Sequence, residues 1–169
     1  MNPHATQGKG SQRRSEHMED PREEYRLANP YIVEGDRPGP DSPRARLPVP
    51  HRQVWAALQD GLRNLPRVRE TIIWCGESWK WSWQYSYADK QLAFLLPSDK
   101  GVSAVLVVDD ELKEELIDRE GFPRRVRDLV DCSDPKGTSR RCWTPVLDVD
   151  TARDFLTAAK TLLEIIRAH

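Results

Sequence analysis

Aromatic side chains occupy every second position from Trp79 to Tyr87, and they are the residues best suited to binding chemistry. Their indole and phenol rings can stack on a flat molecule, and each keeps a polar N–H or O–H that a pocket can use. Glu77 lies just before them and adds a carboxylate that could pair with a cation. The hypothesis is an aromatic pocket for a small planar or cationic ligand. Its candidate residues are Trp79, Trp81, Trp83, Tyr85 and Glu77.

The same alternation is typical of a β-strand whose aromatic side forms part of a core. Successive side chains of a strand point to opposite faces, so the aromatic residues from 79 to 87 would share one face. Phe155, Leu156 and Leu163 of a C-terminal helix could then cover them. Five large aromatics in a row exceed what a small core needs, because each buries about 150–250 Å². A core and a partial pocket therefore both stay open.

A carboxylate pair offers a second chemistry. Glu70 and Glu77 could face one cavity as general acid and base, which makes a small enzyme the alternative function. Other catalytic patterns are missing from the sequence. The segment 75–79 has residue types of a thiol-protease nucleophile in the wrong order, and it lacks the second glycine of a hydrolase elbow. With no phosphate loop and no cluster of His, Cys and Asp, the sequence predicts no catalytic set, no metal site and no cofactor.

The charge balance gives no reason to expect nucleic acid or an anionic membrane as a partner. The 169-residue chain has 26 basic and 27 acidic side chains, and its formal charge is −1. Such a chain exerts no overall attraction on polyanions. An arginine-rich stretch at 119–141 could bind nucleic acid together with the aromatic residues. Acidic residues interleave with it, however, and this favours a solvated surface of mixed charge.

The cysteine spacing and the length of the apolar runs help to predict the cellular compartment. Cys75, Cys132 and Cys142 have no Cys-x-x-Cys spacing. This favours free thiols in a reducing cytosol, with a Cys132–Cys142 bridge or a metal site as the alternatives. The first residues contain no apolar signal-peptide region, and no apolar run reaches the roughly 18 residues that span a bilayer. We therefore expect a cytoplasmic protein.

Residues 1–48 differ in composition from the rest of the chain. Eight of the 13 prolines lie at or before Pro50, among many Gly, Arg and Glu residues. Such a segment buries too little apolar surface to offset the entropy of ordering it, so we expect a disordered N-terminal arm. Its one apolar island, Tyr25–Val33, could dock on the domain as an extended strand.

Residues 49–169 have the hydrophobic periodicity of a single α+β domain. We expect a helix at 51–65, strands at 71–74, 79–87, 91–96 and 102–108, helices at 109–120 and 123–129, a strand at 143–149, and a last helix capped by Asp150. Short connections make the strands an antiparallel meander, and Pro145 places the last strand at a sheet edge. The prediction is a two-layer fold, with an antiparallel sheet of four to five strands and the amphipathic N- and C-terminal helices packed on one face.

One pattern resembles a known family. The chain has Gly76-x-x-Trp79-x-Trp81-Ser82, then Leu95-Leu96-Pro97, an apolar strand at 102–108 and a closing helix that ends at 163–167. Together these are similar to the bacterial family called domain of unknown function 3788, over about residues 50–169. In that family a Gly-x-x-x-Gly-Trp-Ser segment precedes a strand, and Lys80 stands here where the second glycine usually sits. The resemblance implies the domain boundary and a bacterial source, and it supplies no activity.

The sequence thus favours a non-enzymatic module that binds a small molecule or another protein through an aromatic sheet face. An assembly partner, docking through that face or through Tyr25–Val33, is a further alternative beside the enzyme. Nucleic acid and membrane are not expected partners. The sequence leaves open the identity of the ligand and the oligomeric state.

Overall fold

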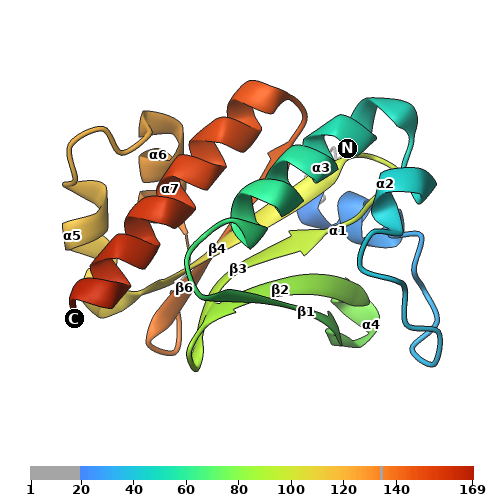
Figure 1. Ribbon diagram of the computed structural model, residues 1–169, viewed down its shortest axis with the longest axis horizontal. Coiled ribbons are helices and arrows are strands. Elements are labelled where there is room, and N and C mark those ends of the chain that lie inside the picture. The colour runs from blue at the N-terminus through green and yellow to red at the C-terminus, as the bar shows by residue number, and fades with distance from the viewer. Residues whose placement is uncertain (1–19, 134) are drawn as a thin grey trace, which may run out of the picture.

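The computed structural model describes residues 20–133 and 135–169. A six-stranded antiparallel sheet runs in the order β1-β2-β3-β4-β6-β5, and the helices α3 and α7 pack side by side across it (Figure 1). The predicted α+β fold is confirmed. The sheet has six strands rather than four to five, because a two-residue strand, β5, extends one edge.

The strands follow the predicted meander closely. They are β1 Val68–Trp74, β2 Trp81–Tyr87, β3 Lys90–Leu96, β4 Val102–Asp109, β5 Pro135–Lys136 and β6 Ser139–Val146. Short connections join β1 through β4, and β6 then pairs with the free side of β4. Only Ser139 and Arg140 of β6 pair with β5, so the rest of β6 lies on an edge. The predicted edge position of Pro145 is thereby confirmed, as suits a residue without a backbone N–H.

The helices lie mostly in one layer. They are α1 Pro21–Leu27, α2 Pro43–Arg46, α3 Val49–Arg63, α4 Gly76–Trp79, a 3-10 turn at Asp110–Leu112, α5 Lys113–Ile117, α6 Arg124–Cys132 and α7 Val149–Ala168. In Figure 1, α5 and α6 lie beside α7 on the same side of the sheet as α3. The N-cap of α7 is Asp148, not Asp150, because the Asp148 carboxylate accepts a hydrogen bond from the Thr151 N–H at 2.7 Å. No helix in residues 20–133 or 135–169 is long and apolar enough to cross a bilayer.

The main core lies between this helix layer and the sheet. Trp83 belongs to it together with Phe155 and Leu163 of α7, as the core interpretation of the sequence predicts. The two long helices approach closely at Gly61 of α3. A Cβ atom placed there would lie 2.5 Å from the Cδ1 atom of Leu156, so the missing side chain makes room for α7.

The segment 20–48 belongs to the fold, whereas its composition predicts a disordered arm. Asn29, only 4% exposed, donates its side-chain N–H to the carbonyl oxygen of Trp81 at 3.2 Å. The ring of Tyr31 lies 5.7 Å from that of Trp83, whose indole N–H donates to the carbonyl oxygen of Pro40 at 2.9 Å. These contacts offset the ordering entropy, because they satisfy polar groups of the core. Residues 1–19 of the predicted arm lie outside the described part of the chain.

Candidate functional site

The aromatic candidates do not share one face. Trp81, Trp83 and Tyr85 lie on β2 and point into the main core, with exposed fractions of 7%, 0% and 0%. Trp79 ends the short helix α4 and packs on the opposite face of the sheet. The chain reverses at Lys80, whose backbone has φ 57° and ψ −148°. Glu77 is exposed in the first turn of α4, and it does not line the groove described below.

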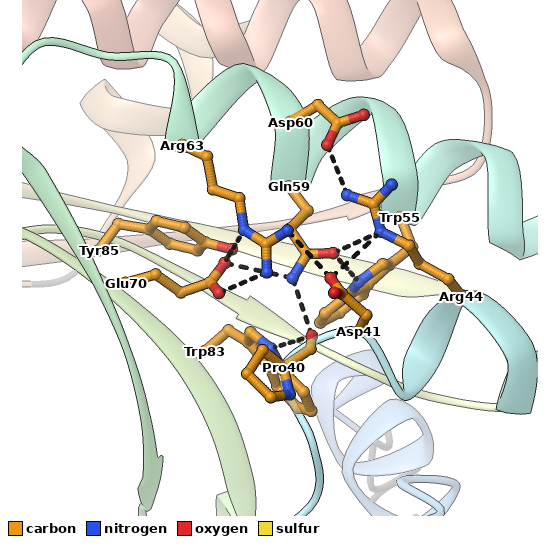
Figure 2. Close-up of polar contacts among 10 residues, drawn as sticks. All are labelled: Pro40, Asp41, Arg44, Trp55, Gln59, Asp60, Arg63, Glu70, Trp83 and Tyr85. Carbon is orange, nitrogen blue, oxygen red and sulfur yellow. Dashed lines mark hydrogen bonds and ion pairs between the residues drawn. The ribbon is translucent and has the colours of Figure 1, made fainter.

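Glu70, the other candidate carboxylate, is held within a network of hydrogen bonds (Figure 2). Its oxygens accept from the Tyr85 hydroxyl at 2.6 Å, from Gln59 Nε2 at 3.2 Å, and from Arg63 Nε and Nη2 at 3.1 and 2.7 Å. Three of these donors meet Oε2 and one meets Oε1, so both oxygens of the carboxylate are engaged. Burial, and then the hydrogen bond to Glu70, raise the pKa of Tyr85 well above its usual range. This geometry opposes a role for Glu70 as an acid or base.

Gln59 connects this network to the N-terminal segment. It is fully buried, and its Oε1 accepts from Trp55 Nε1 at 3.1 Å and from Arg44 Nε at 2.9 Å. Its Nε2 also donates to the carbonyl oxygen of Pro40 at 2.9 Å. Figure 2 shows these residues converging from α2, α3 and β1. The network therefore fixes the segment 20–48 on the domain, and sequence patterns gave no signal of it.

A second apolar cluster lies on the other face of the sheet, which we call the open face. It contains Phe94, Leu96, Val105 and Val107, with Ile73, Cys75, Trp79 and Trp143 packed around them. Strand alternation explains this placement, because neighbours of these residues along the same strands point toward α3 and α7. Helix α1 covers one end of the open face, where the Tyr25 ring packs edge-on against Trp143 at 5.5 Å.

A groove of about 690 Å³ runs across the open face. Its floor includes Phe94 and Val105, and the indole rings of Trp79 and Trp143 form part of its walls. Phe94, Val105 and Trp143 lie on strands that the sequence predicts, but none of them was a candidate site residue. Only Trp79 of the five candidate residues lines this groove.

The charged residues of the groove are mostly basic. Among the described lining residues, Arg22, Arg26, Lys136 and Arg141 are basic and Asp20 is acidic. Arg22 Nη2 pairs with Asp20 at 2.9 Å. The guanidinium carbons of Arg26 and Arg141 lie 5.1 and 5.2 Å from the ring centres of Trp79 and Phe94, respectively. The two guanidinium groups are thus held by cation–π contacts.

The groove also contains a thiol and a buried indole. Cys75 lines it, and burial is the main reason why the pKa of this thiol is raised. Trp143 Nε1 is buried and has no hydrogen-bond acceptor within the described part of the chain. All three cysteines are free thiols in the structure. In the residues that the structure describes, no group of three or more His, Cys, Asp or Glu side chains could hold a metal ion.

Comparison with protein-family models, with curated proteins and with solved structures finds no match to this chain. The resemblance to domain of unknown function 3788 therefore stays a prediction. The chemistry of the groove has to be inferred from its own residues.

Proposed function

We propose that this protein is a ligand-binding module and that the groove on the open face of the sheet is its binding site. The observation that carries the proposal is a groove of about 690 Å³ with aromatic walls on the face opposite the long helices. Small-molecule sites typically measure about 300–1,000 Å³ and are lined mainly by apolar and aromatic side chains with a few polar groups. The groove lies within this range of volume, and nine of its 16 described lining residues are apolar or aromatic.

The proposal keeps the planar ligand of the sequence hypothesis and moves its site. Trp79 remains a binding residue, whereas Phe94 and Trp143 take the places of Trp81, Trp83 and Tyr85. A non-enzymatic role is supported by the state of the two acidic groups in the groove, a carboxylate and a thiol. Asp20 is already paired with Arg22, and the raised pKa of Cys75 disfavours a reactive thiolate.

A thermal-shift screen of the full chain against metabolites, nucleotides, metals and short oligonucleotides tests the proposal. A ligand at 100 times its dissociation constant should stabilise the fold by about 2.7 kcal/mol, which raises the melting temperature by several degrees. Hits are then measured again with Trp79→Leu, and with Tyr87→Leu as the matched control on the helix side of the sheet.

We expect Trp79→Leu to abolish the shift and Tyr87→Leu to retain it. A cooperative melt with no hit in the screen would count against a binding module. An unchanged shift in Trp79→Leu would place the ligand away from the groove.

A further inference from the structure

The groove is positively charged although the chain as a whole is almost neutral. The formal charge of the chain is −1, whereas the described lining residues of the groove include four basic side chains and one acidic one. That one carboxylate, Asp20, is bound by Arg22 at 2.9 Å. A cleft lined by one sign of charge concentrates the opposite sign, because low-dielectric walls focus the field.

We propose that the ligand of the groove is a planar anion, a flat ring system that carries a carboxylate or a phosphate. Arg26 and Arg141 bind its charged group. This inference rests on the proposed function, since it names the ligand class of the same groove. It replaces the cationic ligand that the sequence suggested, because Glu77, the carboxylate meant to bind a cation, does not line the groove.

The state of the two arginines supports anion binding. Within residues 20–133 and 135–169, neither Arg26 nor Arg141 forms a salt bridge. Arg26 acts on Asp20 only as a nearby charge, and the one hydrogen bond of the Arg141 guanidinium reaches Gln91 at 3.4 Å. Arg63 shows the contrast, because Glu70 and Asp41 bind its guanidinium at 2.7 and 2.9 Å. A guanidinium group is a rigid fork of donors that fits a carboxylate or phosphate with two hydrogen bonds.

The aromatic walls account for the planar part of the ligand. Trp79 and Phe94 line the groove, and the guanidinium groups of Arg26 and Arg141 lie over their rings, so the groove presents an aromatic surface directly beside each cation. A ring system that stacks in the groove places its acidic substituent near the two guanidinium groups. The volume of about 690 Å³ fits a molecule of nucleotide size.

Two matched ligand pairs test the charge requirement on the unmodified full chain. Indole-3-acetate is compared with indole-3-acetamide, and adenosine monophosphate with adenosine, by isothermal titration calorimetry. Within each pair the ring is the same and only one member is an anion. We expect at least one anion to bind about tenfold or more tightly than its neutral partner, because charge-assisted hydrogen bonds are lost in the neutral molecule. The pair that shows the preference distinguishes a carboxylate from a phosphate.

Variants then locate the anion. Arg26→Gln and Arg141→Gln should each weaken binding of the anion about tenfold and leave binding of the neutral partner unchanged. Arg153→Gln is the matched control, because Arg153 is an exposed arginine on α7 that pairs with Asp150. It should have no effect.

Three outcomes would overturn the inference. Equal affinity for the charged and neutral members refutes the anion and leaves the binding module standing. An anion preference that survives both arginine substitutions refutes the assigned residues. If no ligand binds in this test or in the screen, both the inference and the proposed function fail. The ligand pairs use the unmodified protein, so a variant that does not fold leaves the test intact.

Discussion

Replacing Lys80 by glycine should relieve backbone strain and thereby stabilise the fold. Lys80 has φ 57° and ψ −148°, a conformation that residues other than glycine rarely adopt. Two hydrogen bonds hold it there, from the Lys80 N–H to the Gly76 carbonyl at 2.7 Å and from the Cys75 N–H to the Lys80 carbonyl at 2.8 Å. Glycine adopts such a backbone conformation without steric cost, so the substitution supplies the residue that this turn favours.

The magnitude follows from opposing contributions. A side chain in this region costs about 1–3 kcal/mol of strain. Glycine gives back about 0.4–1 kcal/mol, because it raises the entropy of the unfolded chain. The substitution also removes the hydrogen bond from Lys80 Nζ to the Arg26 carbonyl at 3.2 Å. Alanine removes this bond too and keeps its Cβ atom, so Lys80→Gly should be more stable than Lys80→Ala by about 1–2 kcal/mol.

Urea unfolding, followed by tryptophan fluorescence, measures the difference directly. A gap of this size corresponds to roughly 2–8 °C in melting temperature for a chain of this length. Ala57→Gly is the control, because Ala57 lies inside α3 and glycine there should lower stability by about 0.5–1 kcal/mol. The reasoning is refuted if glycine at position 80 is no more stable than alanine.

Three further substitutions test the packing, the titration and the capping. Gly61→Ala should destabilise the protein by about 1 kcal/mol, because the added Cβ atom would clash with Leu156. In a Leu156→Ala background the same substitution should stabilise the protein. Urea unfolding of this double-mutant cycle measures the coupling free energy between the two positions. The contribution of Tyr85 to stability should be full below pH of about 10, the pKa of an unfolded tyrosine, and should be lost as the pH rises further, because the raised pKa of Tyr85 keeps its proton in the folded state only. The slope above pH of about 10 should be smaller in Tyr85→Phe, as urea unfolding over that range would show. Asp148→Ala should lower stability by about 1 kcal/mol in the same assay, while Asp150→Ala, the cap that the sequence suggested, should change it by less than about 0.5 kcal/mol.

The elements were predictable because their local signals agree with the tertiary structure. The three-four spacing of apolar residues predicts α3 and α7 as amphipathic helices. The short connections between the strands require antiparallel pairing. Both agree with a sheet covered by paired helices. The segment 20–48 was not predictable from composition. This segment contributes backbone carbonyls and a few side chains that accept hydrogen bonds from donors such as the Trp83 indole. The apolar content of a sequence does not reveal such hydrogen bonds, so composition predicted disorder.

The candidate site was only partly predictable, because a period of two fixes side-chain direction only while the strand continues. β2 begins at Trp81, so the turn at Lys80 sends Trp79 to the other face. Phe94 and Trp143 lie on strands that the sequence predicted. Their common groove depends on pairing between distant strands, and β6 joins β4 only after the helices α5 and α6.

Lys80 also connects the strained turn with the groove. Its ammonium group donates to the carbonyl of Arg26, the residue whose guanidinium lies over Trp79. Backbone strain at a binding site often holds the binding residues in position. A substitution that relieves the strain then raises stability and weakens binding. We therefore expect Lys80→Gly to bind the anion preferred in the ligand pairs about 2–10-fold more weakly, the equivalent of one hydrogen bond, while its stability relative to Lys80→Ala rises. Lys80→Arg, which keeps both the cation and the Cβ atom, should bind like the unmodified protein. Unchanged affinity in Lys80→Gly, measured by the same calorimetry, would mean that Arg26 is positioned by its contact with Trp79 alone.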